Sequence, residues 1–489
     1  MKKIILSTLV TFLTFTIAIA QDFTTPDTGV TWTLDDIATA SPTTITISGN
    51  EYTLLGNLTI AESDTVLIDS DLTLLIASEK LVTVFGTFTV DSDMVTITAV
   101  DEADPYEGFR FEEFSEITIK NATIQYGGGL RVLTETFSID NSTITHNVSG
   151  ATTSAVIQFS RGMPQITNNT ISFNENPAIG SAANSAVSAY IFNNIIEGNN
   201  QANRNRPQIN MGTTMAAEPL QIIQNTIIGD PAIDEAGGIA VANFVGGNIN
   251  AIIDANTISG NRFGITILGE IDSVEITNNI ITDNNIQGDP NIGGSGINLN
   301  SSAIGPDVIA TGNEIRGNHW GITLQGSASI NLGDDAANPG GNIFSNNGNG
   351  GAIYALYNNT ENAIEAKHNC WIEGQQSTPE QVEEVIFHFE DDASFGEVTF
   401  DPFLCGVLGV EENTIENVSF YPNPVKNEIN FNALVSIEKV EIYGVQGNLI
   451  SSETISLGQN KISINLPSGL YFVNFSSNTQ SVTKKMMVE

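Results

Sequence analysis

Asparagine and large apolar residues recur together through the middle of the chain. Each unit consists of an Asn, any residue and a large apolar residue, and successive units start roughly 23 to 34 residues apart, a period that indicates a repeat architecture. One unit cannot bury its apolar residue alone, so neighbouring coils must stack to form a core. The Asn members of this series are Asn169, Asn194, Asn225, Asn256, Asn279, Asn313, Asn342 and Asn369.

Two further series keep step with the first. A Gly-Ile pair recurs at Gly238-Ile239, Gly264-Ile265, Gly296-Ile297 and Gly321-Ile322. A second polar residue lies three positions beyond each apolar residue, at Asn174, Asn199, Asp230, Asn261, Asn284, Asn318 and Asn347. Coils of a parallel β-helix are stacked about 4.8 Å apart, so amides at equivalent positions can hydrogen-bond along a column. We therefore predict an all-β solenoid with asparagine ladders and insertions at one corner.

The two ends of this solenoid have their own patterns. Residues 50–100 form short runs of alternating apolar and polar residues, which predict the first coils. Thr378-Pro379-Glu380-Gln381 is a capping box with Pro at the first helical position, which predicts a short helix through about Ile386. Val398-Thr399-Phe400 then predicts a closing strand. Residues 21–405 are thus expected to form one β-helix domain with N-terminal coils and a C-terminal cap.

The pattern changes after the solenoid. From residue 418 to 489, short alternating runs are separated by Pro and Gly turns, which predicts a small β-sandwich. Residues 406–417 are expected to be a linker. At the other end, Lys2 and Lys3 precede an apolar run that ends in Ala18-Ile19-Ala20, which predicts a signal peptide over residues 1–20 with cleavage between Ala20 and Gln21. No later segment is apolar enough to predict a transmembrane helix in the mature protein.

The net charge and the cysteine content limit the classes of ligand and metal that the protein is expected to bind. The formal net charge is −39, and most of it lies in the solenoid, so nucleic acid and other polyanions should be repelled. Such a charge favours solubility outside the cell. It would also attract divalent cations, so Ca²⁺ is possible although no cofactor is expected. Cys370 and Cys405 are the two cysteines, and export through an oxidising compartment favours a disulfide between them over a metal site.

The C-terminal segment resembles a known export signal. Tyr421-Pro422-Asn423-Pro424, then Gly469-Leu470-Tyr471, then the ending at Lys484-Lys485 are similar to the C-terminal sorting domain of type IX secretion cargo. The resemblance implies a bacterium of the Bacteroidetes group, passage from the periplasm through the outer membrane by the type IX machinery, and removal of this domain. The product would be released or anchored on the cell surface to lipopolysaccharide.

The solenoid resembles the right-handed parallel β-helix repeat proteins of the pectin-lyase-like superfamily. The resemblance includes Gly341-Asn342-Ile343-Phe344 and Asn369-Cys370-Trp371, where the superfamily commonly has Asn-Tyr-Trp-Gly. The Cys is a departure from that pattern, which makes a bond to Cys405 in the cap attractive. The superfamily includes lyases, hydrolases, epimerases, adhesins and scaffolds, so the resemblance implies the fold and leaves the function open.

Catalytic patterns are weak in this sequence, and we predict no catalytic residue. Gly333-Asp334-Asp335 is the string closest to an acidic hydrolase motif, but the following Ala-Ala-Asn-Pro-Gly predicts a surface turn. A lyase acting on uronates needs basic residues to neutralise a carboxylate, and the solenoid's basic residues show no cluster in sequence. The four histidines lie outside any nucleophile motif.

One pair of equivalent strings is a candidate ligand site. Asn261-Arg262-Phe263-Gly264 and Asn318-His319-Trp320-Gly321 align with one coil between them. Arg262, Phe263, His319 and Trp320 could therefore form an edge on which a sugar ring stacks. Alternatively, the two rings only cover the corner before the Gly. We expect a glycan- or surface-binding protein without catalysis; a polysaccharide-degrading glycoside hydrolase or lyase and a structural spacer are the alternatives.

Overall fold

The computed structural model describes residues 21–302, 307–405, 418–432, 437–456, 460–477 and 481–489. The expected signal peptide, including Ala20, and the expected linker 406–417 lie outside these residues. The described chain separates into two compact units, a solenoid through Cys405 and a C-terminal domain, each with its own apolar core. Among the described residues, no helix has the length and apolar character that crossing a membrane would require.

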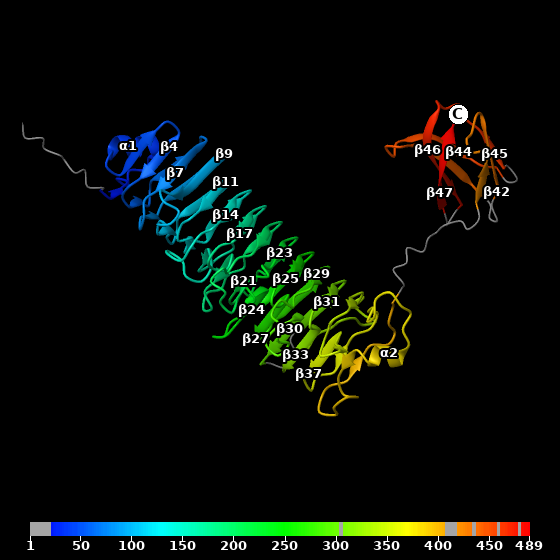
Figure 1. Ribbon diagram of the computed structural model, residues 1–489. Helices are drawn as coiled ribbons and strands as arrows, with labels where there is room; N and C mark the ends of the chain where they lie inside the picture. Colours follow the sequence, from blue (N-terminus) through cyan, green and yellow to red (C-terminus); the bar gives the residue numbers. More distant parts are fainter. Residues whose placement is uncertain (1–20, 303–306, 406–417, 433–436, 457–459, 478–480) are drawn as a thin grey trace, which may run out of the picture. The chain divides into compact units, whose positions relative to one another are not determined.

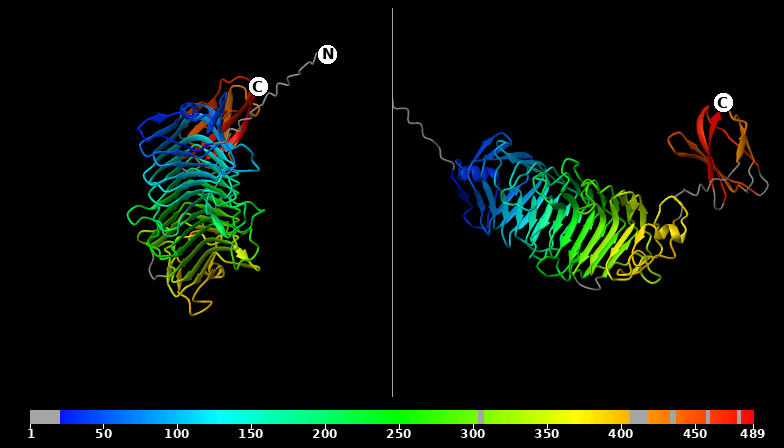
Figure 2. Two further views of the ribbon diagram at one scale, coloured as in Figure 1. Left: turned by 90° about the vertical axis from the view of Figure 1, so that its left-hand side faces the viewer. Right: turned by 60° about the horizontal axis from the view of Figure 1, so that its bottom comes forward.

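The solenoid is a right-handed parallel β-helix, as the sequence predicts (Figures 1 and 2). One long face, called sheet A, is a 14-stranded parallel sheet to which almost every coil contributes one strand. Its strands are β1 (Phe23–Thr24), β5 (Leu58–Ile60), β8 (Leu81–Val84), β10 (Gly108–Phe111), β12 (Leu130–Val132), β15 (Ile157–Phe159), β18 (Ile179–Ser181), β21 (Arg206–Met211), β24 (Ala236–Ala242), β27 (Ile265–Gly269), β30 (Ser295–Ser301), β33 (Trp320–Gly326), β37 (Leu356–Asn359) and β39 (Ile386–Phe387).

Two further parallel faces complete each coil. The face called sheet B contains β2 (Thr31–Trp32), β6 (Thr65–Ile68), β9 (Thr87–Ala99), β11 (Glu116–Gln125), β13 (Thr136–Asp140), β16 (Gln165–Thr167), β19 (Tyr190–Phe192), β22 (Leu220–Ile223), β25 (Asn250–Asp254), β28 (Ser273–Thr277) and β31 (Asp307–Thr311). The face called sheet C shares the long strands β9 and β11 with sheet B. Its other strands are β4 (Glu51–Leu54), β7 (Leu72–Ile76), β14 (Thr143–Thr145), β17 (Thr170–Ser172), β20 (Ile195–Glu197), β23 (Thr226–Ile228), β26 (Thr257–Ser259), β29 (Ile280–Thr282), β32 (Glu314–Arg316) and β34 (Ile343–Ser345).

The asparagine series forms a continuous ladder at the corner between sheets B and C. From Asn169 to Asn369, each side-chain amide donates to the side-chain oxygen of the next Asn at 2.9–3.0 Å. The residue before most ladder positions turns the chain in the left-handed region; Asn168, for example, has φ of 58°. The ladder is buried, so its amides satisfy backbone groups that a sharp corner would otherwise leave unpaired.

The second polar series also forms a ladder, with one difference from the sequence pattern. Gln208 of β21, not Asp230, continues the column: Asn199 donates to Gln208 at 3.1 Å, and Gln208 donates to Asn261 at 3.0 Å. A carboxylate has no N–H to donate, so Asp230 could accept but not pass on the hydrogen bond. Its carboxylate instead accepts from the Gln201 side chain and the Ala232 backbone nearby.

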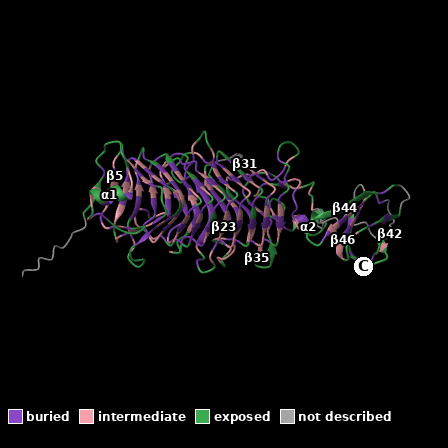
Figure 3. Cartoon of the chain, turned by 90° about the horizontal axis from the view of Figure 1, so that it is seen from above, coloured by how far each residue is buried: buried purple, intermediate pink, exposed green. Residues whose placement is uncertain are grey.

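Apolar side chains fill the inside of the coils, and Figure 3 shows buried residues along the length of the solenoid. Caps close both ends. Helix α1 (Leu34–Ala40) lies in the first coil beside the antiparallel pair of β3 (Ile45–Ser48) and β4. Helix α2 (Pro379–Glu383) has the predicted capping box but ends before Ile386, because β39 begins there and adds to sheet A. Two short pairs complete the C-terminal coils: β35 (Gly348–Asn349) with β36 (Ala352–Ile353), and β38 (Ile364–Glu365) with β40 (Val398–Thr399).

The C-terminal domain consists of two antiparallel sheets around one apolar core. One sheet has the order β41-β42-β45 and the other the order β44-β43-β46-β47, so the domain is a small β-sandwich. Its strands are β41 (Ser419–Tyr421), β42 (Glu428–Asn432), β43 (Lys439–Gly444), β44 (Leu449–Thr454), β45 (Lys461–Ser463), β46 (Gly469–Ser476) and β47 (Ser481–Val488).

Candidate functional site

The outer face of sheet A carries a row of polar side chains over its C-terminal strands. In register, Thr266 of β27 pairs with Asn298 of β30, Asn298 with Thr323 of β33, and Thr323 with Tyr357 of β37. Side chains alternate between the two faces of a strand. Ile265 and Ile267 point into the core, so Thr266 points outward. The four equivalent side chains therefore lie side by side along the solenoid axis.

A groove of about 480 Å³ lies over this row. Its floor is tied together by hydrogen bonds: the Thr323 hydroxyl donates to the Asn298 side-chain oxygen at 2.8 Å and lies 3.0 Å from the Ser295 hydroxyl. A parallel row places Asn300 beside Gln325, where the Asn300 amide donates to the Gln325 oxygen at 3.3 Å. The floor thus presents amide and hydroxyl groups that can still donate and accept toward a ligand.

Aromatic rings form part of the walls. Phe263 and Trp320 both line the groove, and the strand register places them at equivalent positions with Ser295 between them. The Trp320 ring packs against Tyr357, with the ring centroids 5.0 Å apart. The structure therefore brings together the two aromatic members of the predicted edge.

The two basic members of that edge lie elsewhere. Arg262 is only 7% exposed, and its guanidinium bonds to the Ile292 carbonyl and to Glu235. His319 has its Nε2 3.1 Å from the Gln287 carbonyl oxygen. Neither residue lines the groove. Only the two aromatic members of the predicted edge therefore lie at the groove, because the side chains of Arg262 and His319 turn toward backbone carbonyls, which compete for their N–H donors.

The described lining of the groove is uncharged. It contains amides, hydroxyls, apolar side chains and aromatic rings, without Asp, Glu, Lys, Arg or His. Burial raises the pKa of the Tyr357 phenol, and the nearby Tyr354, Asp391 and Asp392 add to this effect. The phenol therefore stays neutral at ordinary pH and can act as a hydrogen-bond donor.

The acidic pair Asp334-Asp335 lies in a surface turn. The Asp334 carboxylate accepts from the Asn331 side chain and from backbone N–H groups of residues 336–338, which hold the pKa of Asp334 well below its usual range. The pKa of Asp335 is lowered by hydrogen bonds from Lys367 and then His368. The Asp334 carboxylate therefore stabilises the turn itself, and the Asp335 carboxylate binds the turn to the neighbouring coil. Among the described residues, no group of three or more His, Cys, Asp and Glu side chains is placed to hold a metal ion.

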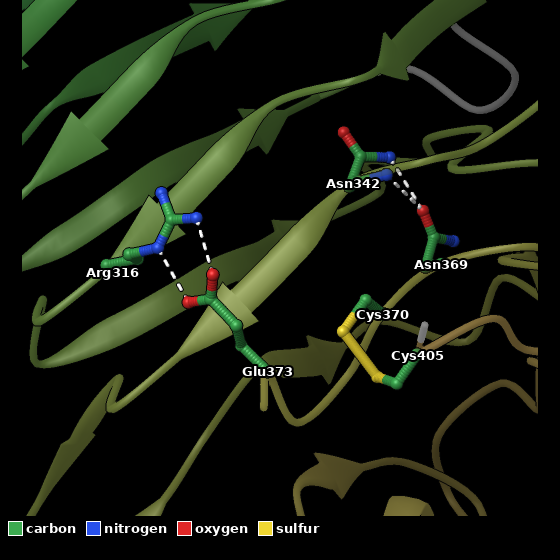
Figure 4. Close-up of a disulfide and its surroundings, with 6 residues drawn as sticks. All are labelled: Arg316, Asn342, Asn369, Cys370, Glu373 and Cys405. Carbon is green, nitrogen blue, oxygen red and sulfur yellow. Dashed lines mark hydrogen bonds and ion pairs between the residues drawn. A yellow bond between two sulfur atoms is a disulfide. The ribbon is translucent and has the colours of Figure 1, made fainter. Parts of the chain in front are cut away.

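The last coil is joined to the cap by a disulfide between Cys370 and Cys405 (Figure 4). The bond follows directly on the last ladder residue, Asn369, which accepts from Asn342 at 2.9 Å. It closes a loop with a sequence separation of 35 residues, which contributes about 3–4 kcal/mol in the chain-entropy model. On the outer face of sheet C, Arg316 forms a two-pronged ion pair with Glu373.

The residues of the expected sorting motif lie in the sandwich. Asn423 ties the segment between β41 and β42 to β47: its side-chain oxygen accepts from Met487 N–H at 2.8 Å, and its amide donates to the Lys485 carbonyl at 3.1 Å. The Tyr471 hydroxyl donates to the Pro467 carbonyl at 3.0 Å. Tyr421, Pro422, Pro424 and Gly469 belong to the same turns and strands.

Comparison with known proteins identifies this domain. Residues 419–489 match the family described as the secretion system C-terminal sorting domain. Two solved structures, both mutants of the periplasmic alginate epimerase AlgG, are similar at 12% identity; each comparison covers 76% of this chain and 81% of the other, with TM-scores of 0.36 and 0.37. That likeness is too distant to indicate an activity. No curated protein matches the chain significantly.

Fold and sorting domain together define the class: an exported parallel β-helix protein that is cargo of the type IX secretion system. The sorting domain directs the protein to the cell surface or beyond it, as the sequence predicts.

Sequence reasoning missed the floor of the groove, although a signal for it was present. Three of the four residues in the main floor row directly follow a Gly-Ile pair of the repeat: Thr266 follows Ile265, Asn298 follows Ile297 and Thr323 follows Ile322. The Ile of each pair points inward, so the next residue must point outward. The position directly after each Gly-Ile pair could therefore have identified this row of outward side chains from the sequence.

Proposed function

We propose that the groove on sheet A binds a neutral glycan and that the protein acts as an exported glycan-binding protein. The single observation behind this proposal is the lining itself, in which aromatic rings stand beside a floor of amides and hydroxyls without charged side chains. Sugar rings present C–H faces to aromatic rings and hydroxyls to amides. A groove of this volume accommodates a short stretch of a polysaccharide.

Charge supports a neutral ligand over an acidic one. An acidic glycan would bring carboxylates or sulfates into a groove that offers no basic partner among its described lining residues. The strongly acidic protein would also repel it at a distance. A neutral glycan brings no unpaired charge into the groove and is not repelled by the acidic protein. Its hydroxyls give up hydrogen bonds to water and form hydrogen bonds with Asn298, Thr323 and Gln325 instead.

The chemistry of the lining favours binding over cleavage. Inverting glycosidases hold two carboxyl groups about 6.5–9.5 Å apart, and retaining enzymes hold them closer. The described lining of the groove contains amides and hydroxyls but no carboxyl group. Amides do not ionise near neutral pH, so they cannot act as the general acid or general base. A hydrolase or lyase remains the competing proposal, and the experiment below distinguishes the two.

The test is a panel of hexasaccharides titrated calorimetrically into the purified protein. Neutral probes are cellohexaose, xylohexaose, mannohexaose and laminarihexaose, and the acidic probe is hexagalacturonate; each is also assayed for new reducing ends. We expect at least one neutral probe to bind without release of reducing ends. Phe263→Ala and Thr323→Val should weaken that binding at least about 10-fold, the effect of losing one good contact. Thr257→Val, on the outer face of sheet C, is the matched control.

Each of the following outcomes would contradict the proposal. Binding of hexagalacturonate but not of the neutral probes would point to an acidic ligand. Release of reducing ends that the groove variants abolish would establish the enzymatic alternative. Equal binding by the wild type and both groove variants would place the ligand elsewhere. Repeating the titrations with EDTA tests the Ca²⁺ that the acidic composition makes possible; binding in this groove should not change.

A further inference from the structure

We infer that Arg262 and His319 are positioning residues that hold one wall of the groove in its binding shape. The wall is the segment 285–294, called the wall loop, which precedes β30 and contributes Pro290, Asn291 and Ile292 to the groove lining. The inference rests on the proposed function, because it assigns these residues a part in ligand binding. It explains why they recur at equivalent positions without touching the groove.

The wall loop is held from both of its neighbouring coils. Arg262, in the coil before it, donates through Nε to the Ile292 carbonyl at 3.0 Å, and Nη2 reaches the same oxygen. In the coil after it, His319 Nε2 lies 3.1 Å from the Gln287 carbonyl, and Trp320 Nε1 donates to the Pro290 carbonyl at 2.9 Å. Three backbone carbonyls of one loop are thus bound by side chains from two different coils.

Arg262 is well suited to this task because its guanidinium is itself anchored. Its Nη1 donates to Glu235 at 3.0 Å and also to Asn205. A buried guanidinium must have its donors satisfied, and its planar fork allows it to bridge a carboxylate and a carbonyl at once. The side chain therefore connects the coil containing Glu235 to the wall loop across its own coil.

Two glycines allow the loop to lie this close. A Cβ atom on Gly293 would meet the Arg262 side chain, with Cγ only 2.9 Å away. A Cβ atom on Gly294 would collide with the His319 ring, and Gly294 also has φ of +87°. The Gly-Gly pair, Arg262 and His319 therefore form one packed unit behind the groove wall.

A wall that is held in place before binding costs little to order when the ligand arrives. The hydrogen bonds within the loop are few and lie near Asp289, which accepts from Asn291. Without Arg262, the Ile292 carbonyl would turn to water, and the Asn291-Ile292 portion of the wall would sample other positions. The groove would then bind its ligand more weakly although every residue that touches the ligand is unchanged.

The experiment compares Arg262→Met with Arg316→Met, which removes another well-paired arginine whose side chain bonds to Glu373 and Glu314 on sheet C rather than to the wall loop. Hydrogen exchange measured by mass spectrometry reports on the wall loop, and titration with the best neutral hexasaccharide reports on the groove. We expect exchange at residues 287–292 to be at least 10-fold faster in Arg262→Met, with unchanged exchange in the asparagine ladder and a Kd at least fivefold higher. Arg316→Met should change neither quantity, and Gly293→Val should reproduce the Arg262→Met result.

The two proposals can fail separately. Unchanged exchange of the wall loop in Arg262→Met overturns the inference, whether or not any saccharide binds. Faster exchange with an unchanged Kd also overturns it, because Arg262 would then stabilise the loop without serving the groove. If the wild type binds no member of the panel, the proposed function fails, and the exchange data still decide whether Arg262 holds the wall.

Discussion

Asp64 is a single carboxylate that organises the first coil. The backbone N–H groups of residues 27 to 30 donate to it at 2.8–3.1 Å, and its side chain is almost fully buried. Burial alone would raise its pKa, but the hydrogen bonds from Val30, Thr25, Thr28 and Asp27 outweigh burial and lower the pKa to about 2. The ionised form is therefore part of the folded structure.

This shift predicts a pH-dependent stability. The folded pKa lies below the usual aspartate value of 3.8, so the unfolded state binds the proton more tightly. The stabilising contribution of Asp64 is complete above the unfolded pKa and is lost as pH falls through the folded value. We expect Asp64→Ala to cost about 1–3 kcal/mol at pH 7 and clearly less at pH 3, measured by thermal unfolding. The exposed Asp93→Ala is the control; an equal loss at both pH values would contradict the prediction.

At the scale of structural elements, the asparagine ladder should tolerate little change. The Asn256 amide donates to the Ile222 carbonyl at 2.8 Å and to Asn279 at 2.9 Å, and its oxygen accepts from Asn225. Asn256→Leu would leave these buried partners unsatisfied, at a cost of about 1–3 kcal/mol. The outward Thr257→Val should change the free energy of unfolding by less than about 0.5 kcal/mol. Denaturant unfolding measures both, and equal losses would show that the coil register is wrong.

The ladder also shows which elements a sequence can predict. Its Asn residues keep a constant offset from an inward apolar residue, so the corner and both neighbouring strands could be predicted together. Gln208 was missed because it reaches the column from sheet A rather than from the corner. Phe263 and Trp320 occupy equivalent positions in the repeat, so aligning the coils by sequence already places the two rings on one edge. The wall loop was missed because an insertion has no repeated counterpart, and its carbonyls redirect Arg262 and His319 away from the groove.

At the scale of the whole molecule, the two compact units have separate cores and different tasks. The solenoid contains the groove, both ladders and its own C-terminal cap with the disulfide. The sandwich contains the sorting domain. Because the solenoid's apolar core is closed without residues 418–489, its folding should not depend on them.

Deleting residues 418–489 tests whether the solenoid folds on its own and whether the sandwich is needed only for export. We expect the shortened protein to fold, with circular dichroism and thermal unfolding of the solenoid unchanged, and to remain in the periplasm. Exported wild-type protein should begin at Gln21 and end within 406–417, as read by mass spectrometry, and a covalently attached glycolipid there would indicate anchoring to lipopolysaccharide. Intact Tyr471-Phe472-Val473 peptides in the exported protein would show instead that the sandwich is retained.

The ladders also determine how the protein resists deamidation of asparagine. This matters for an exported protein, because a damaged copy outside the cell is not replaced there by new synthesis. Slow hydrolysis turns an asparagine amide into a carboxylate, which has no N–H to donate. In the ladder, each such change would break the bonds to the next coil and to a backbone carbonyl and would bury a charge beside acceptor oxygens. The first ladder is fully buried and each Asn is followed by a residue other than Gly, such as Thr257 after Asn256. Both features hinder attack of the following residue's backbone nitrogen on the Asn side-chain carbonyl. The ladder, on which the stacking of the coils depends, is therefore protected from deamidation.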